Sequence, residues 1–271
     1  MDGRLRTPTP EMYQLMTRPK TGSGITTAMI LAAGLGTRIR DVSNTLPKQL
    51  LSIAGQPLID YALSSATQAG VTAIIVNTHY RAELIAAHLK GCATKPGAPF
   101  IRTVHEGVRL ETGGGVRNAL PHLGPQAFFV MNSDSIVVDG SGNSLLRLAA
   151  AWDEEQMDAL LLLSPLATAS GYDGAGDFVG TTPDDSPPGT ASALRRRAEG
   201  EAGLVFTGVQ VLHPRLFSTA PDGAYSLNIH YDQAAARGRL YGLSHVGDWF
   251  HVGTADGLRR ADAGLSKAAM R

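Results

Sequence analysis

Glycines and cations that could hold a phosphate group follow the first apolar run of the chain. The segment 28–33, Ala-Met-Ile-Leu-Ala-Ala, is followed by Gly34 and Gly36 and then by Arg38. Glycine lets the backbone turn sharply and approach an anion without a Cβ in the way. Arg38 and the later Lys48 supply two cations that could reach phosphates held by such a loop. The alternative is an ordinary strand-to-helix turn with two solvated cations, because Gly-x-Gly turns recur in many α/β proteins.

A carboxylate stands at the end of another apolar run. Asp134 comes shortly after the segment 127–131, Ala-Phe-Phe-Val-Met. In an open α/β sheet, ligands bind beyond the carboxyl ends of the strands. A carboxylate there suits Mg²⁺, which takes one or two protein carboxylates and completes its shell with water and phosphate oxygens. An Asp that caps the following turn is the alternative, and a phosphate loop on an earlier strand of the same sheet favours the metal ligand.

A second glycine-rich segment spans 106–116, with the sequence Glu-Gly-Val-Arg-Leu-Glu-Thr-Gly-Gly-Gly-Val. Its three consecutive glycines open a helical segment, where the backbone could approach a planar ligand closely and aim N–H groups at it. A capped helix start is the alternative. No Ser/His/Asp or Cys/His arrangement typical of nucleophilic catalysis is evident in the sequence.

The elements that must position these residues alternate between strands and helices. This alternation predicts an α/β fold with a doubly wound, mostly parallel, Rossmann-like sheet and helices on both faces. Between 170 and 203 the pattern fails, which predicts a loop or ragged hairpin with an edge strand over 177–180. Apolar runs predict strands over 28–33, 71–77, 100–104, 127–131, 159–163, 204–212 and 240–245. Helical spacing predicts helices over 56–69, 80–90 (ended by Gly91), 143–152, 229–237 and 254–270.

Composition indicates a globular protein with no bias toward polyanions. Hydrophobic residues make up 43% and charged residues 18% of 271 residues, and 24 basic residues balance 24 acidic ones. We therefore expect neither a nucleic-acid partner nor a membrane partner. The single Cys92 excludes an internal disulfide, and no apolar run approaches the roughly 20 residues that span a bilayer, so we expect a cytoplasmic protein. Residues 1–27 are expected to form a flexible N-terminal arm, and 28–271 a single domain.

The loop after the first strand also resembles a known signature. Residues Leu31 to Arg38, followed by Pro47-Lys48, resemble the Leu-x-x-Gly-x-Gly-Thr-Arg and Pro-Lys motifs of the sugar-1-phosphate nucleotidyltransferases. The resemblance implies the fold of that family and a nucleoside triphosphate and a sugar 1-phosphate as substrates. It places the nucleotide at Leu31, Ala32, Ala33, Gly34, Gly36, Thr37, Arg38, Asn77, Glu106, Thr112 and Gly113. It places the sugar phosphate at Asn132, Glu111, Thr207 and Gly208.

The resemblance also implies a mechanism without a protein nucleophile. The phosphate of the sugar 1-phosphate attacks the α-phosphorus in line and expels pyrophosphate, so the protein contributes positioning and electrostatics. Arg38 is expected to hold the β- and γ-phosphates. Lys48 is expected to bridge the α-phosphate and the sugar phosphate, and Asp134 to fix the metal ion. These three are the predicted catalytic residues.

Two further segments refine the expected substrates and metal. Leu110 to Gly114 resembles the form found in N-acetylmuramate-1-phosphate uridylyltransferases and their relatives, which implies UTP, N-acetylmuramate 1-phosphate and cell-wall sugar recycling. Mannose or heptose 1-phosphate with GTP, or nucleotide-sugar binding without turnover, are the alternatives. In the segment 248–254, His251 stands where the family has its second metal-binding Asp. Asp134 and His251 are thus the expected ligands of Mg²⁺, or of Mn²⁺ or Co²⁺ because of the imidazole. The alternatives are that Asp134 holds Mg²⁺ alone with waters, or that His251 only hydrogen-bonds a phosphate. The sequence predicts no oligomeric state.

Overall fold

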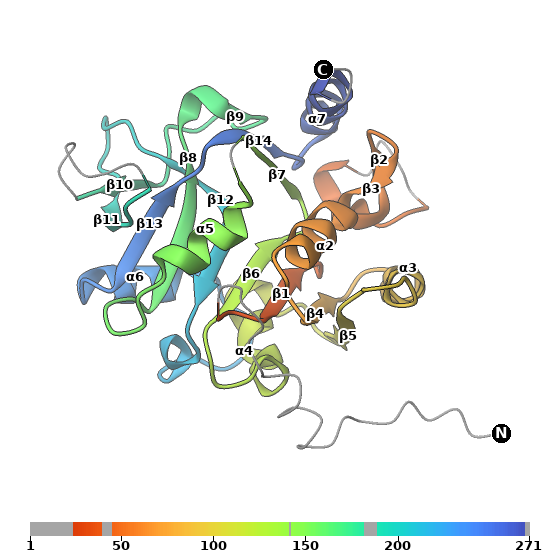
Figure 1. The fold of residues 1–271 in the computed structure, drawn as a ribbon, viewed down its shortest axis with the longest axis horizontal. Coiled ribbons are helices and arrows are strands. Elements are labelled where there is room, and N and C mark those ends of the chain that lie inside the picture. The colour runs from red at the N-terminus through yellow and green to blue at the C-terminus, as the bar shows by residue number, and fades with distance from the viewer. Residues whose placement is uncertain (1–23, 40–44, 141, 182–188, 269–271) are drawn as a thin grey trace.

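A nine-stranded mixed sheet forms the centre of the molecule (Figure 1). The computed structural model describes residues 24–39, 45–140, 142–181 and 189–268. The strands follow the order β10-β11-β13-β8-β12-β6-β1-β4-β5 across the sheet. Their bounds are β1 Thr27–Leu31, β4 Ala73–Thr78, β5 Phe100–His105, β6 Phe128–Asn132, β8 Ala159–Ser164, β10 Phe178–Gly180, β11 Ser192–Arg196, β12 Val205–Leu212 and β13 Leu240–Ser244.

Strand directions agree with the predicted doubly wound sheet. β1 pairs in parallel with both β4 and β6, so that Met29 lies opposite Ile75 on one side and Val130 on the other. β12 runs antiparallel to both of its neighbours, β6 and β8, and β11 runs antiparallel to β10 and β13. The other strands share one direction. Their carboxyl ends therefore meet at one edge, where ligands bind in open α/β sheets.

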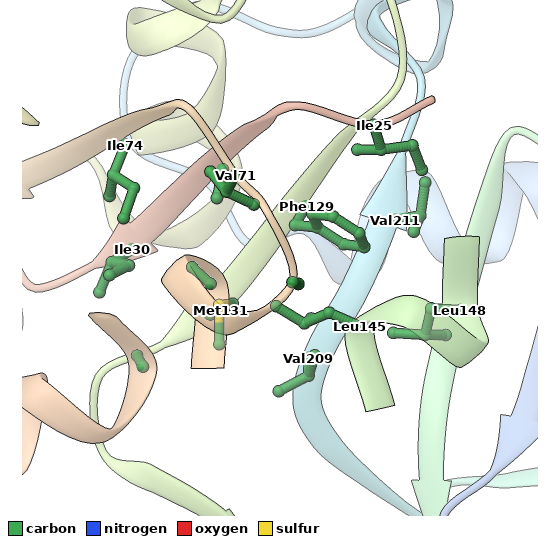
Figure 2. Packing of buried hydrophobic residues seen from close by; sticks show 14 of the residues in the cluster. Ile25, Ile30, Val71, Ile74, Phe129, Met131, Leu145, Leu148, Val209 and Val211 are labelled. Atoms are coloured by element: carbon green, nitrogen blue, oxygen red, sulfur yellow. The ribbon is translucent and has the colours of Figure 1, made fainter. Parts of the chain in front are cut away.

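Helices cover both faces of this sheet, which explains why its central strands are apolar throughout. Helices α2 Leu58–Gln68, α3 Ala82–Ala93 and α5 Ser144–Ala151 pack on one face. Figure 2 shows part of this packing, with Phe129 and Met131 of β6 beside Leu145 of α5. Helices α4 Glu111–Leu123 and α6 Asn228–Ala236 pack on the other face, against residues that include Met29 and Phe128.

A smaller three-stranded sheet, which the sequence does not predict, lies beside the central one. It joins β7 Ser135–Asp139, β14 Gly247–His251 and β9 Ala169–Ser170, and α7 Ala255–Ala268 packs on β14 (Figure 1). A third apolar cluster holds these parts together through Ile136, Phe250 and Ala261. It includes Ile53 of the short hairpin formed by β2 Ser52–Ile53 and β3 Gln56–Pro57. His251 pairs with Ser135, the first residue of β7, and therefore lies near Asp134, the residue that precedes β7.

The segment 170–203 forms the predicted hairpin, in which the edge strand β10 pairs antiparallel with β11, and β11 joins β13 of the central sheet. Two details differ from the prediction. Helix α3 does not end at Gly91 but continues to Ala93, because Gly91 adopts ordinary helical geometry. Ile25 is buried and β1 begins at Thr27, so the folded region starts before residue 28; residues 1–23 of the expected arm lie outside the described residues. No helix within the described residues is long and apolar enough to cross a membrane.

Candidate active site

A cavity of about 510 Å³ opens at the carboxyl ends of β1, β4 and β6. We refer to it as the main cavity. Most residues predicted to act on substrates line it: Leu31, Ala33, Gly34, Gly36, Thr37, Arg38, Lys48, Asn77, Glu111, Thr112, Asn132 and Asp134. Six further residues line the cavity that the sequence does not predict, Leu35, Gln49, Arg109, Ser133, Ser226 and Gly253. Leu35, Gln49 and Ser133 are immediate neighbours of predicted residues, Arg109 and Gly253 lie two positions from Glu111 and His251, and Ser226 carries no local signal.

The loop after β1 is held in place by the segment that contains Lys48. Gly36 has a φ of 60°, and a Cβ at this position would lie 3.0 Å from the Cβ of Lys48. The Gln49 side-chain amide donates a hydrogen bond of 2.8 Å to the carbonyl oxygen of Ala32. Glycine is therefore needed at 36 both for its backbone angle and for the close approach of Lys48. Arg38 is exposed at the rim, while its neighbour Ile39 is buried and fixes the loop.

Lys48 and Asp134 form an ion pair in the main cavity. The Nζ atom of Lys48 lies 2.8 Å from the Oδ2 atom of Asp134, and the two side chains are 9% and 32% exposed. Burial would raise the pKa of the Asp134 carboxyl, but the charge and hydrogen bond of Lys48 outweigh burial and hold this pKa below its ordinary value. Asp134 is therefore a carboxylate at neutral pH, and a fixed cation lies within reach of whatever this carboxylate binds.

His251 lies behind the cavity wall rather than on it. A Cβ on the lining residue Gly253 would overlap the His251 ring, and the ring stacks on Trp249 with centroids 5.9 Å apart. Burial lowers the pKa of His251, the Asp134 charge opposes this effect, and Lys48 and Arg38 add to it. The imidazole is therefore neutral at pH 7 and keeps a lone pair that a metal ion could use.

Asp134 and His251 are two donors of the kind that could hold a divalent cation. The N–H of Val252 donates a 2.9 Å hydrogen bond to the carbonyl oxygen of Asp134, so the backbone next to His251 lies against Asp134. Two protein donors leave most coordination positions to water and phosphate oxygens, as is usual for cations bound together with nucleotides.

Two predicted nucleotide-binding residues, Ala32 and Glu106, do not line the cavity but hold a residue that does. The N–H of Ala32 donates a 2.8 Å hydrogen bond to Oδ1 of Asn77, and Nδ2 of Asn77 donates a 2.7 Å hydrogen bond to Glu106. Glu106 is only 2% exposed and also accepts a hydrogen bond from the N–H of Leu110. This chain fixes the Asn77 side chain and ties the first strand to the glycine-rich segment.

The three consecutive glycines pack closely against other parts of the protein, and Gly113, predicted to bind the nucleotide, is not among the residues that line the main cavity. The N–H groups of Gly113 and Gly114 both donate to the carbonyl oxygen of Tyr225, at 2.8 and 3.2 Å. A Cβ on Gly113 would overlap the Tyr225 ring, and one on Gly114 would overlap the Gly223 carbonyl oxygen. The glycines therefore let the segment around Tyr225 lie directly on α4, and this segment leads to the lining residue Ser226.

Glu111 begins α4 with an unusual backbone. Its φ is 60°, a left-handed value that costs a non-glycine residue roughly 1 kcal/mol or more. Its carboxylate lies 3.8 Å from the Arg109 guanidinium, and both residues line the main cavity. Strain of this kind persists where the surrounding structure enforces it and clusters at ligand sites.

Thr207 and Gly208, predicted on the sugar side, support the site from behind. Thr207 is fully buried, and its hydroxyl donates a 2.9 Å hydrogen bond to the carbonyl oxygen of Leu162. Gly208 has a φ of 82°, and a Cβ there would lie 2.5 Å from Nδ2 of Asn132. The glycine thus makes room for Asn132, which lines the cavity.

The fold and this site define the class of the protein. Residues 27–174 match the family described as "Nucleotidyl transferase", and the chain belongs to that family. The predicted resemblance to sugar-1-phosphate nucleotidyltransferases is thereby confirmed, and so is the α/β fold class.

Individual relatives show which named enzymes this chain is similar to. The chain is 40% identical to the N-acetylmuramate alpha-1-phosphate uridylyltransferase of Caulobacter vibrioides over 89% of this chain and 97% of the relative. It is 33% identical to the enzyme of the same name from Neisseria meningitidis, over 87% and 96%. A mannose-1-phosphate guanylyltransferase of Mycobacterium tuberculosis is 25% identical, over 88% of this chain and 64% of the relative. The crystal structure of UDP-glucose pyrophosphorylase complexed with UDP-glucose has the same fold, with a TM-score of 0.73, 18% identity and coverage of 90% and 99%.

Proposed function

We propose that this protein transfers a uridylyl group from UTP to N-acetylmuramate 1-phosphate and releases pyrophosphate. The observation that carries the proposal is the Lys48–Asp134 pair, which lies in one cavity with the glycine loop and Arg38. Two relatives that the chain covers over 97% and 96% of their length, at 40% and 33% identity, bear the name of this activity. The reaction would provide a nucleotide sugar during cell-wall sugar recycling in the cytoplasm. A single domain that begins near β1 would carry the whole active site.

The residues of the cavity suit a reaction between two polyanions. The sugar phosphate is itself the nucleophile, so the protein must bring it close to the α-phosphorus of UTP and offset their repulsion. Arg38 at the rim would hold the β- and γ-phosphates. Lys48 would bridge the α-phosphate and the sugar phosphate, and it reaches this position by exchanging its contact with Asp134 for phosphate oxygens.

A divalent cation would take the place of Lys48 as the partner of Asp134. We propose Mg²⁺, held by Asp134 and His251, with Mn²⁺ or Co²⁺ as substitutes because an imidazole favours them. When bound, the ion would neutralise triphosphate oxygens and stabilise the charge that builds up in the transition state. Replacement of His251 by Asp should shift the preference toward Mg²⁺ and away from Mn²⁺ and Co²⁺. An identical metal ranking in both proteins would show that His251 does not bind the metal.

Base and sugar selection would fall to residues at the start of α4 and the loop before α6. Glu111, Thr112 and Ser226 line the cavity there and offer a carboxylate and two hydroxyls. The Thr112 hydroxyl already accepts a 2.9 Å hydrogen bond from the N–H of Leu227, which positions it. A guanylyltransferase acting on mannose or heptose 1-phosphate is the second candidate, supported by the relative from Mycobacterium tuberculosis.

Pyrophosphate release tests these alternatives directly. UTP and GTP would each be combined with N-acetylmuramate 1-phosphate, mannose 1-phosphate and heptose 1-phosphate, and Asp134→Asn would serve as the inactive control. We expect the highest kcat/KM for UTP with N-acetylmuramate 1-phosphate. A preference for GTP would replace the proposal with the second candidate. Nucleotide-sugar binding without release of pyrophosphate in any combination would indicate a protein that binds without turnover.

A further inference from the structure

Three potential metal ligands meet between helices α2 and α3. They are Asp60 in the first turn of α2 and His88 and Cys92 on α3. One donor atom from each residue lies within 4.8 Å of the other two. The Oδ1 atom of Asp60 lies 2.6 Å from Nε2 of His88, and the Cys92 sulfur lies 3.6 Å from the same nitrogen. None of the three residues lines the main cavity.

The helix geometry brings these side chains together. His88 and Cys92 are separated by four residues, so they lie one turn apart on the same face of α3. This alignment depends on the continuation of α3 through Gly91 to Ala93, since a helix that ended at 91 would leave Cys92 in a loop. Asp60 approaches from the neighbouring helix, and the side chains of Asp60 and His88 are only 17% and 25% exposed.

The arrangement is not that of a nucleophile relay. In a Ser/His/Asp or Cys/His/Asp relay, the carboxylate binds one ring nitrogen of the histidine and the nucleophile binds the other. Here both Asp60 and Cys92 face Nε2 of His88. Three donors that converge on one point are instead typical of a metal centre.

We propose that Asp60, His88 and Cys92 bind a soft divalent cation of the Zn²⁺ class, which links α2 to α3. Sulfur and imidazole ligands select Zn²⁺ and Co²⁺ over Mg²⁺, which prefers oxygen. Two negative charges from the thiolate and carboxylate match the charge of the ion. Ligand atoms around tetrahedral Zn²⁺ lie about 3.2–3.6 Å apart, so the 2.6 Å contact of His88 with Asp60 would lengthen by less than about 1 Å, and the 3.6 Å contact with Cys92 already fits.

A fourth ligand can reach this centre from an adjoining cavity. The cavity has a volume of about 330 Å³, and both Asp60 and Cys92 line it, together with the polar side chains of Ser64 and Lys95. Water or a small anion in this space would complete a tetrahedral shell. The ion would thus be bound at a site separate from the catalytic one, and its effect would be on the stability of the α2–α3 pair.

Cobalt binding offers a direct test, because Cys92 is the single cysteine of the chain. Co²⁺ would be titrated into the purified protein, and the near-ultraviolet sulfur-to-cobalt charge-transfer band would be recorded and then displaced with Zn²⁺. We expect a band that saturates at one equivalent and disappears in Cys92→Ser. Asp134→Asn and His251→Asn should keep the band, since they alter the other candidate metal site. A wild-type protein without the band, or a band that survives in Cys92→Ser, would overturn the proposal.

Protection of the thiol gives a second measurement that does not depend on any cysteine variant. Alkylation of Cys92 by iodoacetamide would be followed by mass spectrometry, with Zn²⁺ at 100 times its Kd or with chelator. Zn²⁺ should slow the reaction about 100-fold in the wild type, since the free thiol is then that much rarer. His88→Asn and Asp60→Asn should lose most of this protection while keeping a wild-type circular dichroism spectrum. Equal protection in both variants would show that Cys92 binds Zn²⁺ without the proposed partners and would refute the site.

Discussion

Gly114 tests whether the glycine-rich segment serves packing or ligand binding. We predict that Gly114→Ala destabilises the protein, although alanine is the better helix former by about 1 kcal/mol. Residue 114 lies inside α4, and its N–H donates to Tyr225. A Cβ there would overlap the carbonyl oxygen of Gly223 and lie 3.1 Å from the Cβ of Leu110. Backbone atoms cannot rotate away as a flexible side chain can, so the segment around Gly223 must move.

The magnitude follows from two opposing effects. Overpacking of a well-packed site costs typically about 1–3 kcal/mol, and strain in the backbone hydrogen bonds between Tyr225 and α4 adds about 1 kcal/mol. Subtracting the helix preference of about 1 kcal/mol leaves a net loss of about 2 kcal/mol. For a chain of this size, such a loss lowers the midpoint of thermal unfolding by roughly 4–8 °C.

Gly91→Ala is the matched control for this prediction. Residue 91 also lies inside a helix, α3, but a Cβ there meets nothing within 4 Å. Alanine should therefore stabilise the protein by about 0.5–1 kcal/mol at this position. Thermal unfolding followed by circular dichroism compares the two variants under the same conditions. Equal midpoints for Gly114→Ala and Gly91→Ala would refute the packing role and return the glycines of α4 to the ligand.

Three further predictions concern charge and strain. Lys48→Ala should lower kcat/KM for pyrophosphate release by about 100-fold or more while the protein stays folded; near-normal turnover would exclude Lys48 from the chemistry. Glu111→Gly should raise the free energy of unfolding by about 1 kcal/mol, because glycine adopts the φ of 60° at this position without backbone strain. The same variant should lower kcat/KM. A lower free energy of unfolding in urea titrations would show that the backbone at 111 is not strained. Burial lowers the pKa of His245 in the folded protein, so as pH falls the imidazole is protonated first in the unfolded chain. The free energy of unfolding should therefore decrease from pH 7 to 5.5, and His245→Gln should reduce this decrease. An unchanged decrease in the variant would assign the pH dependence to other groups.

Sequence patterns predict the central sheet well because its strands are buried on both faces. A continuous apolar run such as 127–131 is typical of a strand buried between two layers of helices, and the order of such runs then determines the parallel connections. The sequence does not predict the small sheet, for the opposite reason. β14 and β7 are only partly buried, and their pairing joins residues more than a hundred positions apart, for which no local periodicity exists.

The same distinction explains which site residues a sequence can predict. Glycines and cations close to one strand end, such as Gly36, Arg38 and Lys48, share a local motif, and the structure places all three at the main cavity. A motif, however, does not show which way a residue faces. Glu106 and Thr207 belong to segments of the site but are buried, because each satisfies a backbone group that would otherwise lack a partner.

The contacts of Lys48 and Asp134 carry the most functional information, and their ion pair is visible only in the folded chain. Each residue by itself has an ordinary interpretation, as a solvated cation or a turn cap. The two residues are 86 positions apart in the sequence, but Nζ of Lys48 lies 2.8 Å from Oδ2 of Asp134, because β1 and β6 are parallel neighbours whose carboxyl ends meet. A partly buried ion pair gains little stability by itself, since desolvation offsets much of the attraction. Its placement in a cavity agrees with the proposed mechanism, in which Lys48 would exchange this partner for phosphate oxygens and Asp134 would exchange it for a divalent cation.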